Sequence, residues 1–299
     1  MINIDFLYLL DVIRPITALS GPYILELHPL SDLPESIPAS PSLSVIMCVH
    51  RAHPWLAAAI DSVLDQDDTD FQFLIAANAC TNELWHELQE YAKNDERVLL
   101  FRSEIGQLSF NLNMLVDRAT GDYVVRMDSD DVCEPQRIQK LRRAIAEGQP
   151  DIIGSCVSII DENGSTVGKM ELPINNAEIV RALPLRTAFC HPSVAIRRRF
   201  LIDIRGYLGG FASEDMDLWL RAKRAGAIMH NLPERLLRYR VHGTQSIGSR
   251  TGYAEVTGLW LREFLLAPSV FTAQGLSISL FKALFATWLP GARRYRNRK

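Results

Sequence analysis

Short apolar runs alternate with segments of helical periodicity along much of the chain. Residues 43–49 are apolar almost without interruption, as in a strand buried on both faces, and apolar positions at helical spacing follow over residues 55–64. The same alternation predicts further strands at residues 71–76, 98–101 and 123–127 and further helices at residues 83–92 and 108–119. Strands separated by helices require crossover connections, so the pattern predicts an α/β fold with a mainly parallel central sheet flanked by helices.

Beyond Pro150 the alternation weakens, which predicts a smaller second region. Residues 151–160 indicate one or two strands, and the turn residues at 161–165 predict a hairpin with a strand around Val167. A short helix is expected at residues 177–183, a strand at 193–196, and a helix over 216–225 that ends at Gly226.

Two terminal segments differ from the main domain, which we place at residues 42–245. Prolines recur through residues 1–41, break any long periodic element and predict an N-terminal extension. Residues 246–299 predict a helical C-terminal tail, apolar or small at nearly every position from Leu276 to Leu289. Basic residues follow this stretch: Arg293, Arg294, Arg296, Arg298 and Lys299. The apolar stretch is too short to span a bilayer, so we expect either a helix in the membrane interface, with the basic residues toward anionic headgroups, or a helix packed on the domain or on a dimer partner.

Composition and charge narrow the possible partners and compartments. A chain of 299 residues with 47% hydrophobic content can bury one substantial core, and 32 basic against 35 acidic residues leave a formal charge of −3, which gives no reason to expect nucleic acid as a partner. The five cysteines are odd in number, widely spaced and contain no Cys-x-x-Cys pair, which disfavours a disulfide framework and a zinc site. With no basic start or cleavage site at the N-terminus, the sequence predicts a protein of the reducing cytoplasm.

Three carboxylates follow the strand expected at residues 123–127. Asp128 and Asp130 are two positions apart and can point to the same side, while Asp131 points elsewhere or begins the next element. Like charges held this close need compensation, and carboxylate oxygens suit hard cations such as Mg²⁺ or Mn²⁺. The alternative is that Asp131 only caps the helix that begins after Pro135.

Polar residues also follow the first two strands. His50 and Arg51 come directly after residues 43–49, and Asn78 follows the second strand. Because ligands of open α/β sheets bind beyond the carboxyl ends of the strands, we expect these residues to meet Asp128 and Asp130 in one crevice. A nucleotide-plus-metal site explains this coincidence better than independent helix caps.

Five segments in order resemble family 2 glycosyltransferases of the GT-A fold. They are SVIMCVHR at 44–51 with AIDSVLDQ at 59–66, GDYVVRMDSDD at 121–131, HPS at 191–193 with GY at 206–207, SEDMDLW at 213–219, and LPE at 232–234 with YRVH at 239–242. The resemblance covers about residues 43–242. It implies a Rossmann-like nucleotide-sugar-binding half at 42–132 and a smaller acceptor half at 133–245.

The resemblance also implies roles for individual residues. Asp128 would contact the nucleotide ribose and Asp130 would bind a Mn²⁺ or Mg²⁺ ion that bridges the donor diphosphate. Asp215 would be the base that deprotonates the acceptor in an inverting displacement, with Glu214 holding the acceptor or orienting Asp215. His242 would add a metal or phosphate contact, or else lie in the surroundings of the site.

Further residues beside these motifs are expected to bind the nucleotide sugar. By the same resemblance this set is Val49, Arg51, Asn78, Arg126, Asp128, Ser129 and His191. Arg126 contacts the diphosphate or sugar, or else pairs with a neighbouring acid on its strand. The basic residues at 197–199 attract an anionic acceptor, or else are only solvated.

One segment departs from the family pattern. Where the family usually has a carboxylate-rich sequence, residues 76–82 read AANACTN, which removes the carboxylates that commonly contact the nucleotide base. The amide of Asn78 can still bond a base edge as donor and acceptor. UDP-sugars are the commonest donors of the family, and GDP, dTDP or another carrier stays open.

The resemblance predicts a cytoplasmic glycosyltransferase of cell-surface polysaccharide or lipopolysaccharide biosynthesis, either free in the cytoplasm or peripheral on the inner face of the plasma membrane. Its acceptor would be a glycan or a lipid-linked molecule. Two alternatives remain open. A sugar nucleotidyltransferase would need a Gly-rich basic loop after the first strand, which residues 49–54 lack, and a decayed nucleotide-sugar-binding scaffold would bind its ligand without turnover.

Overall fold

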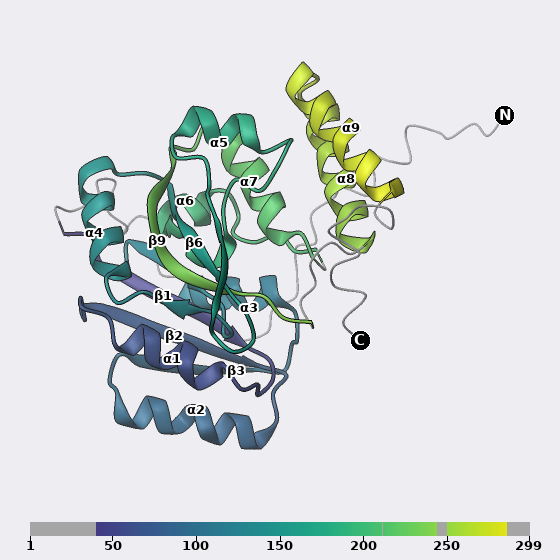
Figure 1. Cartoon of the computed structure of the whole chain (residues 1–299). Coiled ribbons are helices and arrows are strands. Elements are labelled where there is room, and N and C mark those ends of the chain that lie inside the picture. Colours follow the sequence, from purple (N-terminus) through teal and green to yellow (C-terminus); the bar gives the residue numbers. More distant parts are fainter. Residues whose placement is uncertain (1–39, 211, 244–249, 286–299) are drawn as a thin grey trace, which may run out of the picture. The chain divides into compact units, whose positions relative to one another are not determined.

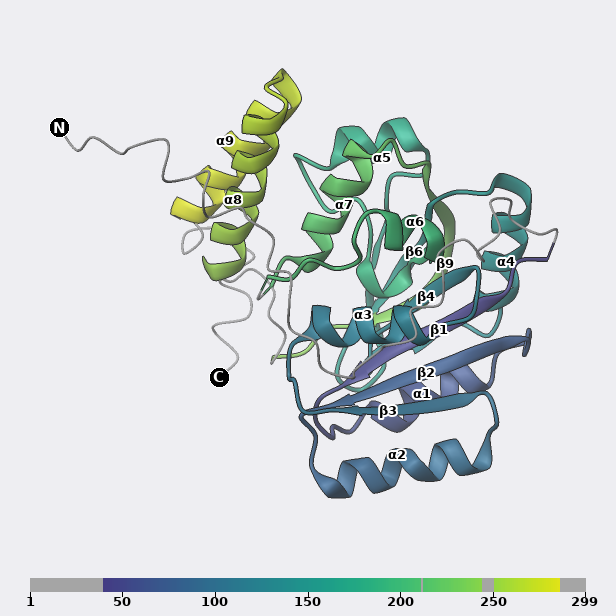
Figure 2. The same cartoon turned by 180° about the vertical axis from the view of Figure 1, so that it is seen from behind.

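The protein is described by a computed structural model over residues 40–210, 212–243 and 250–285. These residues form a nine-stranded sheet with helices on both faces (Figure 1, and from behind in Figure 2). Its parallel half consists of β1 (Leu43–Val49), β2 (Phe71–Asn78), β3 (Val98–Ser103) and β4 (Tyr123–Met127). They are ordered β3-β2-β1-β4 and all three pairs are parallel, which confirms the strands predicted for this half.

Antiparallel pairs enter the sheet beyond β4. The further strands are β5 (Val132–Cys133), β6 (Ile152–Ile160), β7 (Thr166–Met170), β8 (Ala195–Arg197) and β9 (Met229–Arg240). β8 pairs antiparallel with both β4 and β6, and β9 runs parallel to β6 and antiparallel to β5. β6 and β7 form the predicted hairpin, in which Asp161 accepts hydrogen bonds from the backbone N–H groups of Asn163 and Ser165.

The helices cover the two faces in separate groups. One group is α1 (Leu56–Leu64), α2 (Asn82–Asn94) and α4 (Arg137–Gly148), and the other is α3 (Leu108–Arg118), α5 (Asn176–Ala182), α6 (Arg198–Asp203) and α7 (Glu214–Arg224). In β1, Val45 and Met47 pack into the first core and Ile46 into the second. Two buried faces explain why β1 is apolar at nearly every position.

Two helices at the C-terminal side form a hairpin, α8 (Arg250–Leu266) and α9 (Val270–Phe285). Gly275 of α9 lies directly against Trp260 of α8, since a Cβ atom at Gly275 would be 2.2 Å from the indole ring. α9 therefore packs on α8 at Gly275, while Leu280, Phe281, Leu284 and Phe285 of the apolar stretch are exposed. In the ranges that the structure describes, no helix is both long and apolar enough to cross a membrane. The expected extension at 1–41, apart from residues 40 and 41, and the basic residues from 293 onward lie outside those ranges.

Candidate nucleotide-sugar and metal site

The three carboxylates of the acidic motif lie together just beyond β4. One oxygen from each of Asp128, Asp130 and Asp131 is within 4.8 Å of the others. Strand geometry ends at Met127 and the chain turns at Ser129 and Asp130. Alternation of faces therefore no longer applies, and Asp131 joins the other two carboxylates. The sequence had predicted that Asp131 would point elsewhere or begin the next element.

Asp131 is the buried member of this group, with an exposed fraction of 0%. One of its oxygens accepts a hydrogen bond of 2.8 Å from the backbone N–H of Arg240, and the other has no hydrogen-bond partner among the described residues. Burial and the charges of Asp128 and Asp130 raise the pKa of Asp131 well above its usual range. Since α4 begins only at Arg137, Asp131 is not its cap.

The three carboxylates of the acidic motif fit the ligand preferences of a hard divalent cation. They offer oxygens within reach of one another, and one of these oxygens is buried without a hydrogen-bond partner. Oxygen ligands of this kind suit Mg²⁺ and Mn²⁺, and a cation would offset the repulsion between the carboxylates.

His242 reaches the acidic motif from just beyond β9. Its Nε2 atom lies 2.8 Å from Oδ2 of Asp130, and its ring packs on Trp55 with 4.7 Å between ring centroids. The guanidinium of Arg240 also lies on the Trp55 ring, 5.2 Å from its centroid. The ends of β4 and β9 and the start of α1 therefore meet at Asp130.

Arg126 is buried beneath the motif, with 2% of its surface exposed. Its guanidinium pairs with the carboxylate of Asp128 and donates to the carbonyl of Met127. The alternative reading of Arg126, an ion pair with a neighbouring acid, is thus what the structure contains. Burial is the main cause of a raised pKa at Asp128, and the charge of Arg126 opposes it.

The other expected nucleotide-binding residues line the carboxyl ends of β1, β2 and β4. Asn78 is buried, its carbonyl lies 2.9 Å from Nδ1 of His50, and its side-chain oxygen has no partner among the described residues. The Ser129 hydroxyl lies 3.1 Å from Nε2 of His53. Arg51 is exposed, whereas the Val49 side chain is packed entirely in the core, which leaves only its backbone for a ligand.

Glu214 and Asp215 form the first turn of α7. Ser213 occupies the capping position, but its hydroxyl donates to Glu255 at 2.8 Å and accepts no capping hydrogen bond from the described N–H groups of the helix. Burial, followed by the charge of Asp215, raises the pKa of Glu214 to about 7. Burial also raises the pKa of Asp215, and the charge of Asp128 adds to this effect. The charge of Asp128 acts on both carboxyl groups, so the acidic motif and the start of α7 lie within electrostatic range of each other.

His191 lies beside Glu214. Its Nε2 atom is 3.3 Å from the Tyr207 hydroxyl and its Nδ1 atom is 3.8 Å from Glu214. Burial and the charge of Arg126 lower the pKa of His191 well below its usual value, so the imidazole is neutral. A neutral ring can donate a hydrogen bond to a ligand or accept one from it without adding charge to the site.

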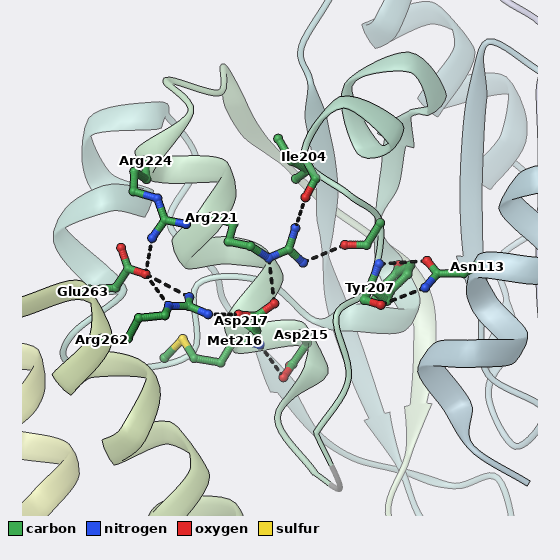
Figure 3. A network of polar contacts seen from close by, with 11 residues as sticks. Asn113, Ile204, Tyr207, Asp215, Met216, Asp217, Arg221, Arg224, Arg262 and Glu263 are labelled. Carbon is green, nitrogen blue, oxygen red and sulfur yellow. Dashed lines mark hydrogen bonds and ion pairs between the residues drawn. The ribbon is translucent and has the colours of Figure 1, made fainter. Parts of the chain in front are cut away.

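A network of ion pairs fixes α7 against α8 (Figure 3). Asp217, one turn into α7, binds Arg221 at 2.7 Å and Arg262 of α8 at 2.6 Å. Arg221 continues to the carbonyl of Gly206 at 2.6 Å, and Arg262 also pairs with Glu263. The spacing of Asp217 and Arg221 is readable as an i,i+4 pair, but no sequence pattern links Arg262 to them, and sequence reasoning missed it.

Comparison with known proteins agrees with this geometry. Residues 44–205 match the family model described as glycosyl transferase family 2, which is more than half of the chain. The chain belongs to glycosyltransferase family 2. It is therefore a transferase, and the nucleotidyltransferase alternative falls away. Glu214, Asp215 and His242 lie beyond the matched residues.

Similar proteins of known name or structure extend the comparison. The O-antigen biosynthesis glycosyltransferase WbnJ of Escherichia coli is 38% identical over 227 residues, covering 75% of this chain and 89% of that protein. Residues 1–349 of S. aureus TarS in complex with UDP-GlcNAc superpose with a TM-score of 0.64 at 17% identity, over 86% of this chain and 76% of that one. The mannosyltransferase PcManGT of Pyrobaculum calidifontis, in complex with GDP-Man and Mn²⁺, gives 0.56 at 14% identity, over 89% and 83%. These likenesses confirm the predicted GT-A fold for this glycosyltransferase.

Proposed function

We propose that this glycosyltransferase moves a sugar from a nucleotide-sugar donor to a glycan or lipid-linked acceptor, with metal dependence and inversion at the anomeric carbon. The observation that carries the proposal is that ionisable groups from three distant segments lie in contact or within electrostatic range of one another. Asp130 contacts His242, and the charge of Asp128 acts on Asp215 at the start of α7. A donor and an acceptor hydroxyl can be held together by such an arrangement.

The donor would lie along the ends of the parallel strands. Asp130 with Asp131 and His242 would hold a Mn²⁺ or Mg²⁺ ion, which when bound stabilises the negative charge that develops on the departing diphosphate. Asp128 would bind the ribose in the orientation set by its pair with Arg126. Asn78 would bond the base edge, with Val49 contributing its backbone and Arg51, Ser129 and His191 lying beside the diphosphate and sugar.

Asp215 would take the proton of the acceptor hydroxyl. As that proton moves to the carboxylate, the acceptor oxygen forms its bond to the anomeric carbon and the bond from that carbon to the diphosphate oxygen breaks. A single displacement of this kind inverts the configuration. The adjacent Glu214, close to neutral His191, would hold the acceptor or orient Asp215.

Named relatives support the pathway and the donor class. WbnJ is named for O-antigen biosynthesis, which favours a cell-surface polysaccharide or lipopolysaccharide product here. We propose a UDP-sugar as donor, supported by the TarS complex, with GDP-sugars as the competing class given PcManGT.

The reaction would take place in the cytoplasm, consistent with five free cysteines. Exposed apolar side chains gather near the end of α9 at Leu280, Phe281, Leu284 and Phe285, and the basic residues from Arg293 onward follow in the sequence. This combination supports peripheral contact with an anionic inner membrane surface.

A thermal-shift screen of nucleotide sugars with and without Mn²⁺ tests the donor site. Binding stabilises the folded state by mass action, by about 2.7 kcal/mol at a ligand concentration of a hundred times Kd. We expect one nucleotide class to stabilise the wild-type protein with Mn²⁺, and Asp130→Ala to lose that effect while the exposed control Asp117→Ala keeps it.

Three results would count against this assignment. Stabilisation that is unchanged in Asp130→Ala removes its role as a ligand, and a wild-type protein that responds to no nucleotide sugar contradicts the proposed function. A protein that binds its donor but never releases the nucleoside diphosphate is a decayed scaffold.

A further inference from the structure

A pocket of about 190 Å³ lies beside Asp215, between α7, residues 183–189 and the α8–α9 hairpin. Trp219 of α7, Tyr253 of α8 and Phe189 contribute aromatic side chains to its walls. Among the described residues that line it, Asp215 is the one acidic side chain. A concave, largely apolar pocket with few polar groups is typical of small-molecule sites.

Two cations line the same pocket, Arg186 and Lys282. Arg186 donates to the carbonyl of Glu171 at 3.3 Å, and Lys282 of α9 donates to the carbonyl of Leu185 at 3.4 Å. Both bonds are long and have neutral acceptors, and neither cation pairs with a carboxylate within the described ranges. Because Lys282 contacts Leu185, the residue before Arg186, both cations lie at the edge of the pocket where residues 183–189 contact α9.

The pocket therefore has a carboxylate on α7, aromatic walls, and two cations at the edge with α9 that have no counter-ion in the part of the chain that the structure describes. A neutral sugar acceptor would form no ion pair with these cations, whereas an anionic group on the acceptor would form charge-assisted hydrogen bonds with both of them. The repulsion between such a group and Asp215 would also favour one orientation, with the anion at the cations.

We propose that this pocket receives the acceptor, and that the acceptor carries a phosphate or carboxylate group that Arg186 and Lys282 bind. The inference rests on the proposed function and adds the substrate class. The hydroxyl to be glycosylated then faces Asp215. Arg186 lies within the residues matched by the family model, whereas α8 and α9, which carries Lys282, lie beyond them.

Calorimetric titration with matched probes tests this inference. The full-length protein is first loaded with Mn²⁺ and the nucleoside diphosphate selected by the thermal screen. Each of several sugars is then titrated as its methyl glycoside, as its 1-phosphate and as the methyl glycoside of its uronic acid, which separates the neutral form from the phosphate and carboxylate sources.

For at least one sugar we expect an anionic form to bind about tenfold more tightly than the neutral form, which corresponds to about 1.4 kcal/mol. The double variant Arg186→Met with Lys282→Met should reduce the preference to less than about twofold. The matched control, Arg143→Met with Lys93→Met, removes two exposed cations that do not line the pocket and should keep it.

Each remaining outcome overturns the inference. A loaded protein that binds neutral and anionic probes equally, or binds none, has no anionic acceptor site. A preference that survives in the double variant places the anion elsewhere. A wild-type protein that loads no nucleotide overturns the proposed function and this inference with it.

Discussion

At the scale of single residues, buried arginines hold the acidic motif in place. Arg137 has 1% of its surface exposed and donates to the carbonyls of Arg126 and Pro192, each at 2.8 Å. It thereby joins the end of β4 to the short 3₁₀ helix η3 (His191–Ser193), which carries His191. A buried guanidinium that satisfies backbone carbonyls on two segments fixes both of them, and so fixes Asp128 relative to His191.

Glu214 gives a prediction about stability and pH. Its pKa is raised from an ordinary 4.5 to about 7, so the folded state holds this proton more tightly than the unfolded state. The contribution of Glu214 to the free energy of unfolding is therefore greatest below pH 4.5 and falls as the pH rises toward 7.

Glu214→Gln removes this dependence. In urea unfolding, the free energy of unfolding of the variant relative to wild type should rise between pH 4.5 and pH 8, by on the order of 1–3 kcal/mol. Parallel curves for the two proteins over this range would show that Glu214 is not perturbed as described.

At the scale of elements, α8 positions the helix that carries the proposed base. Arg262 reaches the buried Asp217, two residues after Asp215 on α7, as Figure 3 shows. In Arg262→Met, Asp217 keeps Arg221 but loses its link to α8, which should cost about 1–2 kcal/mol of stability. We expect the rate of sugar transfer to fall severalfold while the Kd for the donor stays unchanged.

Arg143→Met is the matched control for this prediction. It breaks an exposed ion pair with Glu147 on α4 and should change neither the rate of sugar transfer nor the Kd for the donor. Transfer kinetics and donor titration on the same preparations decide the matter. An Arg262 variant with wild-type turnover would show that the α7–α8 link does not position Asp215.

The packing of α9 on α8 gives opposite expectations for one substitution at two glycines. Gly275→Ala places a methyl group against the Trp260 ring and should cost about 1–3 kcal/mol of stability. Gly258→Ala, in α8 with no atom within 4 Å of the new Cβ, should be neutral or stabilise by up to about 1 kcal/mol. Thermal unfolding of both variants measures the difference, and a Gly275 variant as stable as wild type would mean that the helices are not in this contact.

At the scale of the whole molecule, the parallel half was predictable because its strands are apolar on both faces. β9 was not predicted as a strand, and only parts of it, at 232–234 and 239–240, entered through the family resemblance. Exposed Glu234 and Arg235 interrupt its apolar pattern, and its register with β6 shifts at Cys156. The position of Asp128 and Asp130 also followed from the sequence. The contact of His242 with Asp130 and the role proposed for Asp215 came from family resemblance, because these residues lie far from the acidic motif in the chain.

What sequence reasoning missed altogether are contacts made by long side chains. Arg137 and Arg262 carry no periodic signal, and their partners are backbone carbonyls or acids on other elements. The pocket lined by Arg186 and Lys282 likewise arises only when α9 folds back beside residues 183–189. Such features depend on tertiary packing and not on local pattern.

The central claim is that a donor site around Asp130 and a base at Asp215 serve one reaction. Its most direct test compares the initial rate of nucleoside diphosphate release between wild type and Asp215→Asn. Each reaction contains Mn²⁺, the donor identified by the thermal-shift screen and the acceptor sugar that the wild-type protein glycosylates fastest. We predict that the variant binds the donor with an unchanged Kd and loses at least about a hundredfold in rate. A variant that binds the donor and turns over within threefold of wild type would contradict the account.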